Sequence, residues 1–80
     1  MKKLLEYIIN NIVEHPEDVR IEQLDDQNND TILKLTVHKE DMGRVIGKEG
    51  KIIKAIRTLL KTKGIISSKK IDLQLVEPEV

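Results

Sequence analysis

Apolar residues along this chain recur at two different spacings, and each spacing predicts one kind of secondary structure. Near the N-terminus they recur every three or four residues, which predicts an amphipathic helix over residues 5–13 that Pro16 stops. Residues 19–25 and 31–38 instead alternate apolar and polar positions, and the polar cluster at 26–30 between them predicts a turn. We therefore expect these two runs to form a β-hairpin.

The second half of the chain combines both spacings. Residues 39–46 predict a short helix, and residues 50–63 predict a longer one that Gly64 is well placed to end. Alternation returns in residues 71–76, which predict a third strand. The order helix, strand, strand, helix, helix, strand predicts an α+β fold in which one three-stranded sheet is packed by helices on a single face.

Size and composition limit the core that this fold can build. The chain has 80 residues, of which 39% are hydrophobic, with no Phe, no Trp and one Tyr. A chain of this length forms one small domain, which we place at residues 1–77 with a frayed tail at 78–80. The core must be aliphatic, and stacking of nucleic acid bases on aromatic rings is nearly excluded as a binding mode.

Several kinds of chemistry find no support in the residues. The absence of cysteine excludes disulfides, a thiol nucleophile and Cys-based zinc sites. His15 and His38 are isolated, so we expect no metal cluster, no cofactor, no small-molecule substrate and no catalytic set. No apolar run approaches the roughly 20 residues of a membrane span, and the N-terminal run lacks a signal-peptide cleavage site. We expect a cytoplasmic protein without membrane contact.

Charge is balanced overall but not along the chain. Residues 1–40 hold five basic and nine acidic residues, whereas residues 41–80 hold nine basic and five acidic ones. Between Met42 and Ile71 the only acid is Glu49. Two interpretations remain open: a solvated helix face, which is where Lys and Arg ordinarily lie, or a surface that faces an anion.

The segment GRVIGKEGKIIKAIR, residues 43–57, interrupts a helical pattern with glycines and then resumes it. Gly47 and Gly50 permit a tight turn and a close approach of another backbone. The helix that starts after Gly50 directs its free N–H groups and positive dipole end into this turn, which suits phosphate. The spacing is neither G-x-G-x-x-G nor that of a P-loop, and the preceding element is predicted to be helical.

This segment resembles the core of the KH domain, in which two helices flank a GxxG loop that clamps about four nucleotides. The helix and strand before that core resemble the type II arrangement of bacterial KH domains. Over essentially its whole length the chain resembles the KhpA-like family of small bacterial single-KH proteins. The resemblance implies a non-catalytic protein that binds single-stranded RNA, as an RNA chaperone or post-transcriptional regulator.

The resemblance also implies roles for individual residues. Gly47 and Gly50 would set the loop, and Lys48 and Glu49 would face the RNA backbone. An apolar groove for the bases and a set of phosphate-attracting cations would complete the site. The groove residues are Val45, Ile46 and Ile53, and the cations are Arg44, Lys51, Lys54 and Arg57.

The apolar stripe of the longer helix is wider than a small core needs. We interpret Ile52 and Leu59 on its flank as a self-association or partner surface, the alternative being that the first helix covers them. The resemblance implies a homodimer, or a heterodimer with a larger KH protein of the KhpB (Jag) kind. Two further functions stay open: a protein-interaction adaptor with little RNA affinity, which Glu49 in the loop favours, and binding of single-stranded DNA.

Overall fold

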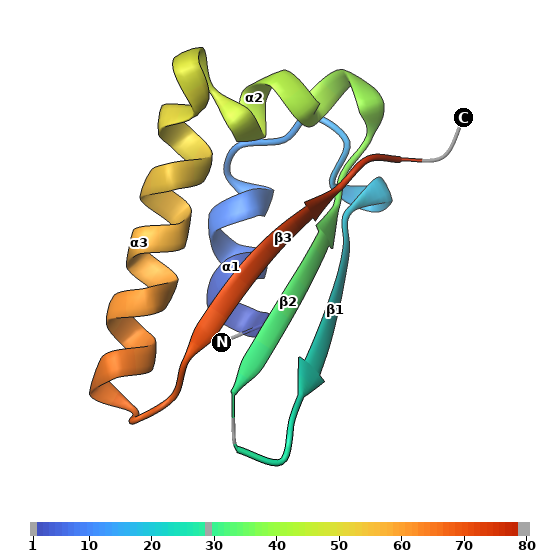
Figure 1. Ribbon diagram of the computed structural model, residues 1–80. Coiled ribbons are helices and arrows are strands. Elements are labelled where there is room, and N and C mark those ends of the chain that lie inside the picture. The colour runs from blue at the N-terminus through green and yellow to red at the C-terminus, as the bar shows by residue number, and fades with distance from the viewer. Residues whose placement is uncertain (1, 29, 79–80) are drawn as a thin grey trace.

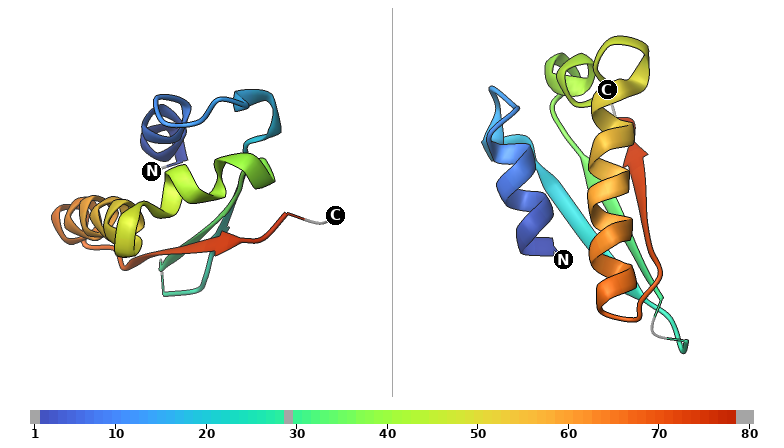
Figure 2. Two further views of the ribbon diagram at one scale, coloured as in Figure 1. Left: turned by 90° about the horizontal axis from the view of Figure 1, so that it is seen from above. Right: turned by 90° about the vertical axis from the view of Figure 1, so that its left-hand side faces the viewer.

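The computed structural model describes residues 2–28 and 30–78. Three helices lie on one face of a three-stranded sheet (Figure 1 and Figure 2). The α+β fold, its α-β-β-α-α-β order and its single helical face are therefore confirmed. Of the predicted tail, only Pro78 falls within the described residues. The elements are α1 (Lys2–Asn10), β1 (Arg20–Asp25), β2 (Thr31–Thr36), α2 (Met42–Ile46), α3 (Lys51–Ile66) and β3 (Ile71–Val76).

The sheet has the order β1-β2-β3, with β2 antiparallel to β1 and parallel to β3. Leu35 of β2 lies between Ile21 of β1 and Leu75 of β3. Alternate side chains of a strand point to opposite faces, and β2 buries every second residue beneath the helices. The parallel pairing of β2 with β3 requires a long crossover, and α2 and α3 form it.

The core is entirely aliphatic, as the composition predicts. Its members come from all three helices and from β2 and β3, whereas β1 contributes only the half-buried Ile21. The buried apolar residues are Leu5, Ile9, Leu33, Leu35, Val37, Val45, Ile53, Ile56, Leu60, Ile71 and Leu73. Both sides of the candidate loop are therefore anchored in one core, through Val45 of α2 and Ile53 of α3.

Gly64 does not end the last helix, so that prediction is wrong. The helix α3 continues through Gly64 to Ile66, and the chain turns at Ser68, whose φ is 58°. A Cβ atom at Gly64 would lie 2.5 Å from the carbonyl oxygen of Lys69. The glycine is buried and lets the segment that leads into β3 pack directly against α3.

The first helix is shorter than its apolar stripe. It ends at Asn10, and its last turn closes through bonds from the amides of Ile12 and Val13 to the carbonyl of Ile9. In the described part of the chain, no helix combines the length and apolarity needed to cross a bilayer.

Candidate functional site

The GKEG loop connects α2 to α3 through backbone conformations with positive φ. Gly47 has φ 75° and ψ 173°, Glu49 has φ 57° and Gly50 has φ 73°. The amide of Gly47 caps α2 by bonding the carbonyl of Gly43 at 2.9 Å, and the amide of Gly50 bonds the carbonyl of Gly47 at 3.1 Å. The tight turn expected of the two glycines is present, and Glu49 adds a left-handed residue that costs about 1 kcal/mol.

Ile52 lies directly over Gly47. A Cβ atom at Gly47 would stand 2.5 Å from Cγ1 of Ile52 and 2.8 Å from its Cβ. By contrast, a Cβ atom at Gly50 would have no neighbour within 4 Å. The two glycines therefore differ: Gly47 is required by conformation and by packing, Gly50 by conformation alone.

Two of the three residues expected to line an apolar groove are buried in the core instead. Val45 is completely buried and Ile53 is 7% exposed, because both point from their helices into the core. Of the three residues expected to line a groove, only Ile46 is half-buried and retains surface. Val45 and Ile53 support the loop from beneath, and in this structure they offer no surface to a base.

Three lysines surround the loop with exposed side chains. Lys48 lies on the loop, and Lys51 and Lys54 lie on the first turn of α3. The Nζ of Lys51 is 4.0 Å from a carboxylate oxygen of Glu49, and both side chains are largely exposed. Pairs of this kind contribute little stability, so water or an anion can readily replace Glu49 as the partner of Lys51.

The two arginines predicted for the site already have partners in the protein. The guanidinium of Arg44 lies 2.7 Å from Oε1 of Glu14 and 3.6 Å from Oδ1 of Asp41. The Nε of Arg57 donates to the carbonyl of Leu73 in β3 at 3.3 Å. Arg44 is thus tied to the connector between α1 and β1, while Arg57 joins α3 to β3.

Asp41, the residue immediately before α2, is a buried carboxylate. It is 1% exposed and accepts hydrogen bonds from the amides of Glu14 at 3.0 Å and His15 at 2.9 Å. Burial raises the pKa of Asp41, but these two amides, together with His15 and Arg44, outweigh burial and hold the pKa below its usual value. Asp41 therefore fastens the α1–β1 connector to the start of α2.

His15 and His38 are not isolated from each other, and that expectation is wrong. Their rings stack with centroids 4.1 Å apart and planes inclined by 24°. The connector brings His15 beside the end of β2, a juxtaposition set by topology that no local sequence pattern reveals. The supposed isolation of the two histidines therefore gives no ground to exclude a metal cluster.

One flank of α3 is uncovered. Leu59 is 54% exposed and Ile52 is 38% exposed, so the first helix does not cover this flank. At the far end of the helix Ile65 and Ile66 are also exposed. Ile52 and Leu59 lie seven residues apart, so they share one face of α3, and neighbouring exposed apolar side chains are a feature of contact surfaces.

Comparison with known proteins gives full-length similarities. The family model described as "KhpA/KhpB, KH domain" matches residues 2–75. The RNA-binding protein KhpA of Listeria monocytogenes is 51% identical over 79 residues, which cover 96% of this chain and all of that protein. The protein of the same name from Chlamydia caviae is 47% identical over 78 residues, which cover 96% of this chain and 97% of that protein. The protein of that name from Clostridium perfringens is 43% identical over 76 residues, which cover 95% of this chain and all of that protein.

Proposed function

The chain belongs to the KhpA/KhpB family of KH domains, and we propose that it binds single-stranded RNA, without catalysis, at residues 47–50. The relatives named above are RNA-binding proteins by name. The observation that carries the proposal is the left-handed turn between α2 and α3, which has no Cβ atom at either end and leads into a helix N-terminus. An RNA backbone can approach such a turn closely. The protein would act in the cytoplasm as an RNA chaperone or post-transcriptional regulator.

The cations differ in how readily they can bind RNA in this proposal. Lys48, Lys51 and Lys54 are exposed and available to phosphates. Arg57 lies where α3 meets β3 and would bind a phosphate further along the same side of the helix. Arg44 would have to release Glu14 before it could bind RNA, so we assign it a smaller contribution.

The salt dependence of binding follows from this assignment. Each phosphate neutralised on a single strand contributes about −0.7 to the slope of log K against log salt concentration. Three lysine contacts and one Arg57 contact therefore give a slope of about −3. Binding should be weak and loosely specific, because four nucleotides offer few base contacts and the domain lacks a stacking platform.

Fluorescence-anisotropy titration of short single-stranded RNA at several salt concentrations tests the proposal. The double variant Lys48→Asp/Glu49→Asp keeps both glycines and removes the loop cation. The matched control makes the same two changes on α1, at Lys3 and Glu6. We expect the loop variant to lose most of its affinity and the control to bind like the wild type. Equal binding by all three proteins would exclude the loop as the RNA site.

We also propose that Ile52 and Leu59 form a contact surface for a second copy of the chain or for a KhpB-like protein. Their exposure beside the candidate RNA site supports this. It also favours the alternative function, an adaptor that binds proteins and has little affinity for RNA. In that case the Glu49 carboxylate would offset the loop cations.

Light scattering after size exclusion tests whether the chain associates with itself through this surface. A 9.2 kDa chain that dimerises doubles its mass, and Leu59→Glu should return it to the monomer. Thr58→Glu places the same charge on the adjacent face of α3 and serves as the control. An unchanged mass for a folded Leu59→Glu protein would remove Leu59 from the interface.

A further inference from the structure

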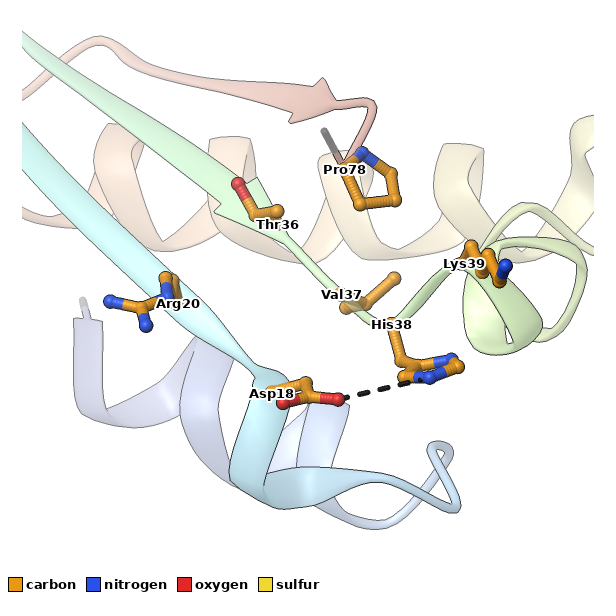
Figure 3. A pocket seen from close by; sticks show the side chains of 7 residues that line it. All are labelled: Asp18, Arg20, Thr36, Val37, His38, Lys39 and Pro78. Carbon is orange, nitrogen blue, oxygen red and sulfur yellow. Dashed lines mark ion pairs between the residues drawn. The ribbon is translucent and has the colours of Figure 1, made fainter. Parts of the chain in front are cut away.

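The stacked histidines stand among carboxylates from two segments of the chain. His15, Glu17 and Asp18 belong to the connector before β1, whereas His38 and Glu40 follow β2. His38 and Asp18 also line an open pocket of about 410 Å³ at this end of the sheet (Figure 3). The cluster lies on the connector side of α2 and is separate in sequence from the GKEG loop.

We propose that His15, His38 and Glu40 form a binding site for a divalent transition-metal ion of the zinc class. One donor atom from each residue lies within 4.8 Å of the donor atoms of the other two. The donors of a tetrahedral zinc site stand about 3.4 Å apart, and Nε2 of His15 is already 3.7 Å from a carboxylate oxygen of Glu40. Two imidazoles and one carboxylate, completed by water, are a donor set that zinc takes in proteins.

Each histidine also has a carboxylate beside its other nitrogen. Nδ1 of His15 is 3.5 Å from Glu17, and Nε2 of His38 is 3.9 Å from Asp18, the contact drawn in Figure 3. Carboxylates in these positions hold the remaining N–H of a metal-binding imidazole and fix its tautomer. The arrangement leaves Nε2 of His15 and Nδ1 of His38 for the ion.

The tautomer of His38 already suits this assignment. Its Nδ1 accepts a hydrogen bond from the amide of Glu40 at 3.0 Å, so in the neutral ring the proton resides on Nε2, facing Asp18. The ion takes the place of that amide at Nδ1. The rings must also fan apart from their near-parallel stack, which their partial exposure to solvent allows.

A bound ion would join two segments that Asp41 already holds together. It would link the connector at His15 to the start of the segment that leads into α2. Because the ion binds the folded arrangement of ligands and the unfolded chain lacks that arrangement, it should stabilise the fold.

Calorimetric titration of the EDTA-treated full chain with Zn²⁺ tests the site. The only two histidines of the chain provide an unambiguous readout, since long-range ¹H–¹⁵N spectra of their imidazoles report both possible nitrogen ligands. His15→Gln and His38→Asn each remove one imidazole, and Asn retains an acceptor for the Glu40 amide. Glu40→Gln removes the proposed carboxylate ligand. Its matched control is Glu22→Gln, on the exposed surface of β1.

We expect one ion per chain, shifts of both imidazoles on binding, and a raised melting temperature. Each histidine variant should weaken zinc binding by more than about tenfold, and Glu17→Gln by about tenfold through its outer contact. Glu22→Gln should bind like the wild type. The proposal is overturned if zinc does not saturate a single site, if only one imidazole shifts, or if the histidine variants bind as tightly as the wild type. None of these outcomes depends on whether the chain binds RNA.

Discussion

Replacing Gly47 by alanine should destabilise this protein far more than the same change at Gly50. The two residues lie three positions apart in one loop and both have φ near 75°, so the substitution is matched in chemistry and location. The difference lies in ψ and in packing. Gly47 has ψ 173°, in a region almost restricted to glycine, whereas Gly50 has the ψ of 16° of an ordinary left-handed residue.

The magnitudes follow from these two differences. Backbone strain at Gly47 contributes about 1–3 kcal/mol, and the new Cβ at 2.5 Å from Cγ1 of Ile52 adds about 1–3 kcal/mol of overpacking. We therefore expect Gly47→Ala to cost about 4 kcal/mol. Gly50→Ala, with no neighbour within 4 Å, should cost about 1 kcal/mol, because alanine also reduces the entropy of the unfolded chain.

Urea unfolding followed by far-ultraviolet circular dichroism measures these free energies, since the chain has no tryptophan to report by fluorescence. Gly43→Ala is the internal control: it lies in α2 with open space around it and should stabilise by about 0.5 kcal/mol. Adding Ile52→Ala to Gly47→Ala should relieve only the part of the clash made by Cγ1 and Cδ1 of Ile52, because the Cβ of residue 52 stays 2.8 Å away and the backbone strain remains. If Gly47→Ala costs no more than Gly50→Ala, the explanation of the loop given above is wrong.

Three further changes test other parts of the structure. Gly64→Ala should cost about 2 kcal/mol in urea unfolding, because its Cβ would lie 2.5 Å from the backbone oxygen of Lys69; a neutral result would refute the close packing described there. Arg57→Gln should reduce the salt slope of RNA binding by about 0.7 with little loss of stability, and an unchanged slope would remove Arg57 from the site. Asp41→Asn should lower the melting temperature at neutral pH. Because the folded pKa of Asp41 lies below its usual 3.8, the gap in melting temperature between wild type and variant should shrink as the pH falls from 3.8 through the folded pKa. A difference that stays constant down to low pH would mean that the charge of Asp41 does not matter.

The sequence predicted the fold well because its signals are local and periodic. Alternation in residues 31–38 and 71–76 identified β2 and β3, and the break at Gly47 identified the boundary between α2 and α3. Gly64 misled because the same residue type serves to end helices and to allow close packing. Only the three-dimensional position of Lys69 distinguishes these uses.

The candidate site was only partly predictable for a related reason. Which residues surround the loop follows from sequence spacing, but burial of Val45 and Ile53 depends on how α2 and α3 meet the sheet. The partners of Arg44, the hydrogen bonds to Asp41 and the stacking of His15 on His38 all join segments far apart in the chain. No pattern within either segment records such contacts.

The most direct test of the central claim is an amide ¹H–¹⁵N titration of the wild-type chain with a short single-stranded RNA. We expect the largest shifts on residues 47–54, with those of Gly47 and Gly50 prominent because their backbone meets the RNA. Shifts confined to the flank of Leu59 or to the end of α3 at Ile65 and Ile66, with the loop amides unmoved, would contradict the claim.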